Sequence, residues 1–122
     1  MKAPSLTLGI EEEYQIIDPS TRELKSYITE ILAGDHMILD EVKPELHQSM
    51  VEIGSKVCKT PQEVREELVR LRGMVMDLAG RNGLVIAAAG THPFSLWTKQ
   101  EITPLERYAG VKQDLQRIAQ EE

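Results

Sequence analysis

Cysteine and aromatic residues are scarce in this 122-residue sequence, which contains one Cys, one Phe and one Trp. The single cysteine, Cys58, cannot form a disulfide within the chain, and this favours a protein of a reducing compartment. No stretch approaches the roughly 20 apolar residues of a membrane-spanning helix. The opening residues also lack the apolar run of a secretory signal. We therefore expect a soluble, cytoplasmic protein whose core consists mainly of Leu, Ile, Val, Met and Ala.

Positive charge is also in short supply. The sequence has 20 acidic and 14 basic residues, which gives a net charge of −6 at pH 7. Such a chain repels the phosphate backbone of nucleic acids on average, so a nucleic-acid partner is not expected. An acidic surface suits cation binding, although many ordinary cytosolic domains are equally acidic. The length fits one domain or part of one.

The first half of the chain is expected to form strands and one short helix. Apolar and polar side chains alternate over residues 5–17, which predicts a strand with two different faces. The Asp-Pro-Ser-Thr sequence at 18–21 predicts a turn, and a second strand at 24–27 would complete a hairpin. We also expect a short helix at 29–32 and another strand at 45–53.

The clearest predicted element is a helix over residues 61–82. Thr60 and Glu63 form a capping box, with Pro61 at the first helical position. Apolar residues then recur at three- and four-residue steps: Val64, Leu68, Leu71, Val75 and Leu78. Gly83 is a natural stop signal for this helix.

The remaining sequence predicts a buried strand at 84–89, a loop at 90–94 and a second helix at 104–120. This helix would start with another capping box, at Thr103. Its apolar stripe would consist of Tyr108, Val111, Leu115 and Ile118. Both long helices are expected to cover the same face of a sheet. Because the helical pattern continues to the last residue, we expect the chain to be the truncated part of a longer domain.

Three adjacent carboxylates, Glu11, Glu12 and Glu13, lie within the first predicted strand. Alternation places Glu11 and Glu13 together on the polar face, where like charges repel. A divalent cation such as Mg²⁺, which prefers oxygen ligands, would turn this repulsion into attraction. A plain solvated strand face explains the same pattern, and both interpretations stay open. Glu12 falls on the apolar side, where it needs a partner, an edge position or a bulge.

A second acidic group consists of Glu45 and Glu52. Glu52 interrupts an apolar run, so it is either exposed or held by a cation. In one regular strand the two carboxylates would point to opposite faces. They can serve one site only if a bulge intervenes or if Glu45 lies outside the strand.

The histidines and the cysteine carry weaker signals. His36 and His47 have no ligand-like spacing, and each is expected to be a surface or hydrogen-bonded imidazole. His92 follows a predicted buried strand and is either a site residue or a residue that stabilises its loop. Cys58 precedes a helix but has no obvious base nearby, so we interpret it as structural.

Four segments, in this order, resemble the type 2 glutamate–cysteine ligases and related carboxylate–amine ligases. They are residues 8–14 (LGIEEEY), 45–53 (ELHQSMVEI), 88–94 (AAGTHPF) and 100–108 (QEITPLERY). Together they extend over nearly the whole chain. The resemblance implies an α+β fold of the glutamine-synthetase type, in which an antiparallel sheet forms a cleft and helices cover its outer face. It also implies that residues 1–122 are the N-terminal portion of one ligase catalytic domain.

The resemblance further implies an ATP-dependent ligase. A carboxylate, by default the glutamate γ-carboxyl, attacks ATP to form an acyl phosphate, and an amine, by default that of cysteine, displaces phosphate. Mg²⁺ or Mn²⁺ would be the cofactor, with Glu11, Glu13 and Glu52 as metal ligands and no other catalytic side chain in this chain. Glu45 and His92 would have a substrate or loop role. The expected partners are ATP and amino acids, with a homo-oligomer as a further option.

Two features depart from that family. Gly54-Ser55-Lys56 stands where relatives often have a Thr-Pro pair. The chain also lacks the later histidine-bearing strand and the basic residues for nucleotide and substrate, so alone it cannot supply a whole catalytic site. The alternative function is a non-catalytic binding or assembly module built on the same half-sheet.

Overall fold

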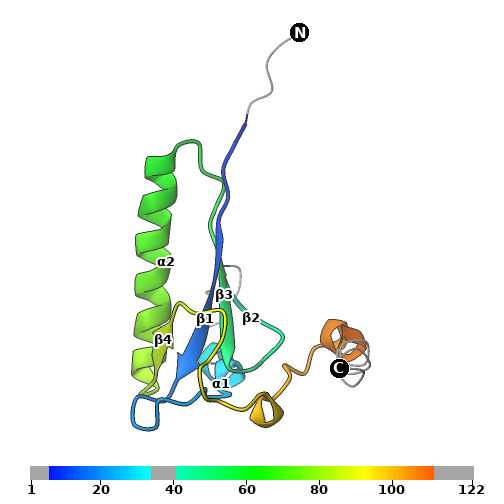
Figure 1. Cartoon of the computed structure of the whole chain (residues 1–122). Coiled ribbons are helices and arrows are strands. Elements are labelled where there is room, and N and C mark those ends of the chain that lie inside the picture. Colours follow the sequence, from blue (N-terminus) through cyan, green and yellow to red (C-terminus); the bar gives the residue numbers. More distant parts are fainter. Residues whose placement is uncertain (1–5, 34–40, 112–122) are drawn as a thin grey trace.

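A computed structural model describes residues 6–33 and 41–111 of the chain. Within these segments, four antiparallel strands form one sheet in the order β2-β3-β1-β4 (Figure 1). The strands are β1 (Glu11–Ile17), β2 (Val42–Pro44), β3 (Met50–Gly54) and β4 (Val85–Ala87). The elements that accompany the sheet are the helices α1 (Ile28–Ala33) and α2 (Pro61–Arg81) and the short 3-10 helix η1 (Trp97–Lys99). The described part is an α+β unit with an antiparallel sheet, as predicted.

Helix α2 forms where the sequence predicts it and for the predicted reasons. The Thr60 hydroxyl accepts a hydrogen bond from the Glu63 backbone N–H at 3.2 Å, and the Glu63 carboxylate accepts one from the Lys59 N–H at 2.6 Å. These bonds satisfy N–H groups at the helix start that have no partner inside the helix. The helix ends before Gly83, whose φ of +69° favours glycine over any residue with a side chain.

The core lies between the sheet and the two helices α1 and α2. The even-numbered side chains Tyr14 and Ile16 of β1 are 4% and 0% exposed. They join one buried cluster with side chains of β3, α1 and α2: Val51, Ile53, Ile28, Ile31, Leu32, Leu71, Val75 and Leu78. The C-terminal half of the predicted α2 stripe is therefore buried, while Val64 and Leu68 near the helix start are half-buried. This arrangement fixes which face of β1 points away from α2.

The predicted hairpin is wrong in its second strand. Residues 24–27 form no strand, and an isolated bridge between Ile17 and Leu24 is the contact with β1 that replaces it. Ile17 pairs with Leu24 on one edge of β1 and with Val85 of β4 on the other edge. Tyr27 and Ile28 instead donate their backbone N–H groups to the Gln48 carbonyl, and the chain enters α1 there. The short helix predicted at 29–32 is thus confirmed.

Three predicted strand boundaries were too generous. β1 begins at Glu11 rather than at residue 5, and Leu8 makes only an isolated bridge with Cys58. The strand predicted at 45–53 is confirmed only from Met50 onward, as β3. The strand predicted at 84–89 is shorter too, and it is not buried on both sides: β4 is a sheet edge, and Val85 is 47% exposed.

The second long helix differs from its prediction in place and in capping. The described part is helical at 106–111, and residues 112–120 lie outside the described segments. The Thr103 hydroxyl donates to the Glu45 carbonyl instead of capping the helix. Tyr108 is buried, and its hydroxyl donates to the Pro44 carbonyl at the end of β2 at 3.2 Å. Figure 1 shows this helix apart from α2, so the expectation that both helices cover one face is wrong for residues 106–111.

Neither α1 nor α2, nor any other helix of the described segments, is long and apolar enough to span a membrane.

An ion-pair network around one buried carboxylate ties the first half of α2 to the chain that precedes it. Glu67 is only 4% exposed and lies 3.0 Å from the Lys56 ammonium. Arg70 donates to Glu67 at 2.9 and 3.2 Å and also holds Glu41 with two hydrogen bonds. The hydrogen bonds from Arg70, followed by that from Lys56, lower the pKa of Glu67 to about 2.

This network should make the chain sensitive to acid. Because the pKa of Glu67 falls from 4.5 to about 2 on folding, the folded chain binds fewer protons than the unfolded chain between these values. Glu67 therefore contributes stability that is present above about pH 4.5 and is lost as the pH falls toward 2. We expect Glu67→Gln to lower the melting temperature at pH 7 and to flatten its pH dependence in this window. Melting curves should show neither change for Glu66→Gln, an exposed neighbour.

Candidate metal centre

The face of the sheet turned away from α2 carries the acidic side chains. Glu11 and Glu13 alternate with the buried Tyr14 and Ile16 along β1, so both lie on this second face, as the sequence predicts. Glu13 is paired with Glu52 of β3 in the antiparallel register. Residues directly opposite each other in such a pair point to the same face with neighbouring Cβ atoms. Two carboxylates from segments far apart in the sequence therefore stand side by side.

Glu45 joins this pair because it lies outside β3. The chain turns between Glu45 and Met50, where the Met50 N–H donates to the His47 carbonyl at 3.0 Å. Carboxylate oxygens of Glu13, Glu45 and Glu52 all lie within 4.8 Å of one another. Of the two arrangements that would allow Glu45 and Glu52 to serve one site, the structure adopts the one with Glu45 outside the strand.

Two backbone contacts hold Glu45 in place. Its carboxylate accepts a hydrogen bond from the Leu46 N–H at 2.6 Å, and its carbonyl accepts one from the Thr103 hydroxyl. The Thr103 N–H in turn donates to the Leu46 carbonyl at 2.9 Å. The segment that resembles the fourth family block thus fixes the turn that carries the third carboxylate.

The group of Glu13, Glu45 and Glu52 is electrostatically unfavourable by itself. Burial, followed by the charges of Glu11 and Glu45, raises the pKa of Glu52 above its usual value, and Lys43 opposes this only in part. Within residues 6–33 and 41–111, none of the three carboxylates forms an ion pair. Closely spaced carboxylate oxygens without a counter-ion are a donor set that suits a hard divalent cation.

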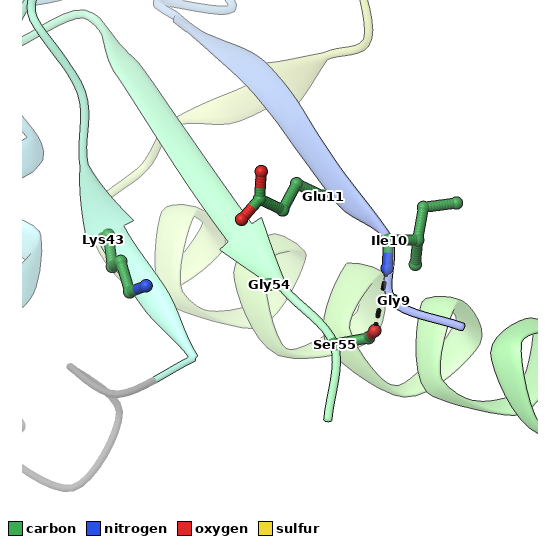
Figure 2. Close-up of a pocket in the computed structure, with 6 residues that line it drawn as sticks. All are labelled: Gly9, Ile10, Glu11, Lys43, Gly54 and Ser55. Carbon is green, nitrogen blue, oxygen red and sulfur yellow. Dashed lines mark hydrogen bonds between the residues drawn. The ribbon is translucent and has the colours of Figure 1, made fainter. Parts of the chain in front are cut away.

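Glu11 lies on the same face but outside this group. It occupies one wall of a pocket of about 380 Å³, which Figure 2 shows. The residues that line the pocket are Gly9, Ile10, Glu11, Lys43, Gly54 and Ser55. Lys43 stands on β2, and β3 separates it from Glu11 on β1 (Figure 2). The Ser55 hydroxyl accepts a hydrogen bond from the Ile10 N–H at 3.0 Å. Sequence reasoning missed Lys43, because β2 has three residues and no readable alternation.

Glu12 points to the helix side and has the partner that its position demanded. Its carboxylate forms an ion pair with Arg72 of α2, whose Nε donates to Glu12 at 2.9 Å and to the Tyr14 hydroxyl at 3.0 Å. The hydrogen bond from Arg72 is the main reason that the pKa of Glu12 is lowered. Glu12 is thus kept apart from the other carboxylates, in a contact between β1 and α2.

A second pocket, of about 370 Å³, lies beyond Gln15 on the same face. His92 lines it, and both ring nitrogens of His92 are engaged with backbone groups. Nε2 lies 2.9 Å from the Arg22 carbonyl oxygen, and Nδ1 lies 3.0 Å from the Ser95 nitrogen. Contacts of this kind stabilise a loop, which is one of the two roles considered for His92. His47 also lines this pocket.

The two remaining candidates from the sequence are Cys58 and His36. Cys58 is fully buried, with its Sγ 3.3 Å from the Lys56 carbonyl oxygen, and this supports a structural role. His36 lies outside the described residues.

Comparison with known proteins gives a consistent set of similarities. The model of glutamate-cysteine ligase family 2 matches residues 7–122. Proteins named "Putative glutamate--cysteine ligase 2" from Roseiflexus castenholzii and Herpetosiphon aurantiacus are each 61% identical over 114 residues. One of the same name from Chloroflexus aggregans is 58% identical over 116 residues. These matches cover 93% to 94% of this chain but only 30% of each relative, so the chain spans under a third of their length.

Proposed function

Because the chain belongs to glutamate-cysteine ligase family 2, we propose that it is the N-terminal part of an ATP-dependent ligase that joins a carboxylate to an amine. The relatives' name supports glutamate and cysteine as the two substrates. In the proposed reaction, an oxygen of the glutamate γ-carboxylate attacks the γ-phosphorus of ATP, and ADP leaves. The cysteine nitrogen then attacks the acyl carbon of the acyl phosphate, phosphate leaves, and the amine loses a proton as the amide forms.

The observation that carries this proposal is the group of three carboxylates on the face opposite α2. Glu13, Glu45 and Glu52 come from three different parts of the fold and converge within 4.8 Å. In the described segments none of them forms an ion pair, and the nearest cross-strand cation is Lys43, the register partner of Glu52. They would hold Mg²⁺ or Mn²⁺, which when bound supplies positive charge to the phosphate oxygens of ATP. Glu11, the third ligand that the family resemblance implies, stays a prediction. It lies two residues along β1 from Glu13.

The contribution of this chain to catalysis would be placement and electrostatics. The sheet holds Glu13 and Glu52 in a fixed register, and the turn anchored by Thr103 holds Glu45. Rigid placement of charges costs no reorganisation when the negative charge of the phosphoryl group shifts during transfer. The second pocket is lined by uncharged side chains and two histidines, and the acidic group therefore carries the negative charge on this face.

The metal site can be tested on the chain itself, without any activity assay. Titration with Mn²⁺, followed by calorimetry and by paramagnetic broadening of backbone NMR signals, should reveal one site centred on β1 and β3. We expect Glu13→Gln and Glu52→Gln each to weaken Mn²⁺ binding at least about tenfold, since each removes a charged ligand. The matched control Glu66→Gln, on the exposed side of α2, should bind Mn²⁺ like the unaltered chain.

Two results would count against the metal site. One is equal Mn²⁺ affinity in the unaltered chain and in both sheet variants. The other is broadening that is strongest around α2 rather than around Glu13 and Glu52.

A further inference from the structure

Glu45 is the member of the acidic group whose place the sheet does not fix. Glu13 and Glu52 are held opposite each other by the register of β1 and β3. Glu45 instead lies in the turn before β3, and its side chain is only half-buried. The contacts that hold this turn come from residues 101–108, more than 50 positions further along the chain.

Thr103 contacts both Glu45 and the residue after it. Thr103 is 4% exposed, its hydroxyl donates to the Glu45 carbonyl, and its N–H donates to the Leu46 carbonyl at 2.9 Å. Pro104 leaves this threonine free to make these contacts, because a proline disfavours helical backbone at the residue before it. The helix that follows begins only at residue 106. A hydroxyl that the sequence pattern assigns to helix capping is thus directed at the turn.

The bond to the Glu45 carbonyl also orients the Glu45 carboxylate. The Glu45 carbonyl and the Leu46 N–H belong to one trans peptide unit, which is planar, so they point in opposite directions. This N–H donates to the Glu45 carboxylate at 2.6 Å. While the Thr103 hydroxyl holds the carbonyl on one side of the peptide, the N–H on the other side stays aimed at the carboxylate. The hydroxyl therefore acts on the carboxylate through the peptide between them.

We propose that Thr103 is a positioning residue for the metal site and acts through the peptide that joins Glu45 to Leu46. The inference rests on the proposed function, because it concerns the cation that the acidic group would hold. Residues that orient metal ligands from behind typically change metal affinity by about ten- to a hundredfold when they are lost. Glu45 depends on such a residue more than Glu13 and Glu52, which strand pairing already holds.

Two further bonds fasten the turn without orienting this peptide. The Gln48 N–H donates to the Glu101 carbonyl at 2.8 Å, and the Tyr108 hydroxyl donates to the Pro44 carbonyl at 3.2 Å. They hold the chain on both sides of Glu45. Loss of the Thr103 hydroxyl should therefore free the peptide to rotate while the turn stays in place.

The test is a double-mutant cycle on Mn²⁺ affinity, measured by calorimetry on the chain itself. Thr103→Val keeps the shape of the side chain but removes the donor, and we expect it to weaken Mn²⁺ binding about tenfold. In the Glu45→Gln background, which lacks the charged ligand, the same substitution should change the affinity by less than about twofold. Thr103→Ser keeps the hydroxyl and should bind Mn²⁺ like the unaltered chain.

A metal-free measurement separates orientation of the peptide from loss of the fold. Exchange of backbone amide hydrogens should become faster at Leu46 in Thr103→Val and stay unchanged at Gln48, whose N–H has a different partner. The matched control is Thr98→Val, an exposed threonine of η1, which should behave like the unaltered chain in both measurements. Melting curves accompany every variant.

Unchanged Mn²⁺ affinity in Thr103→Val, or an equal loss of affinity in both backgrounds, would overturn the positioning role. So would a Thr103→Ser variant that binds Mn²⁺ as weakly as Thr103→Val. These outcomes leave the proposed function standing as long as Glu13→Gln and Glu52→Gln weaken Mn²⁺ binding. If those two substitutions change nothing, the metal site is wrong, and the role of Thr103 falls with it.

Discussion

Glu13→Gln in the full-length protein is expected to lower kcat for ligation by about two to three orders of magnitude. Gln keeps the size of the side chain but removes its charge, so the substitution tests electrostatics rather than packing. Glu13 stands directly opposite Glu52 and within 4.8 Å of the other two carboxylates, so its loss weakens the site that would hold the cation. Steady-state ADP release across a Mg²⁺ titration measures the effect, and high Mg²⁺ should restore part of the activity if binding is weakened.

Glu12→Gln is the matched control, because Glu12 is the next residue on β1 but points to the opposite face. Its carboxylate pairs with Arg72 beside the Tyr14 hydroxyl. The substitution should lower the melting temperature and leave kcat within a few-fold of the unaltered protein. Equal loss of kcat in both variants, with equal melting temperatures, would show that the proposed metal role of Glu13 is wrong.

The elements predicted best are those whose signals are local. The start and end of α2 follow from Thr60 and Gly83, and the alternation along β1 correctly separates Glu11 and Glu13 from Glu12. These features depend on backbone geometry over a few residues, which the sequence alone specifies. The need of Glu12 for a partner was predictable for the same reason.

The features that were missed depend on contacts between distant residues. Arg72 lies 60 positions from Glu12, and no periodicity connects them. Beyond the Leu24 bridge, the strand predicted at 24–27 gives way to hydrogen bonds from Tyr27 and Ile28 to the Gln48 carbonyl, a contact that no local pattern indicates. The turn at Glu45 likewise depends on Thr103, which follows 58 residues later.

The acidic site also combines features that are local in sequence with contacts between distant residues. Sequence pattern alone supports two carboxylates on one face of β1, but the register with β3 brings Glu52 beside Glu13. The addition of Glu45 requires that it lie outside the strand, which the sequence left open as one of two arrangements and the turn before Met50 provides. Lys43 was missed because it lies on β2, a strand too short to predict.

The largest expected effect is a complete absence of turnover in the isolated chain. Its described segments supply one acidic group on one face of a sheet, and Glu13 of this group is exposed. Large apolar side chains near this face are exposed, including Trp97 at 76%, Leu96 at 57% and Phe94 at 55%. In relatives more than three times as long, further chain is available to cover such surfaces. The proposed reaction needs ATP, a carboxylate and an amine held together, and misplacing one reacting group costs orders of magnitude in rate.

We therefore expect no ADP release above background when the purified 122-residue chain is given ATP, Mg²⁺, glutamate and cysteine. The positive control is a full-length protein containing this chain, assayed at the same concentration. Mn²⁺ binding by the same chain preparation shows that the fold and its carboxylates are intact, so a missing activity then reflects missing groups rather than unfolding. Sustained ADP release that requires both glutamate and an amine would show that this chain holds a complete site. An inactive full-length protein that still binds Mn²⁺ would instead favour the non-catalytic binding or assembly module, because the acidic group would then hold a cation without phosphoryl transfer.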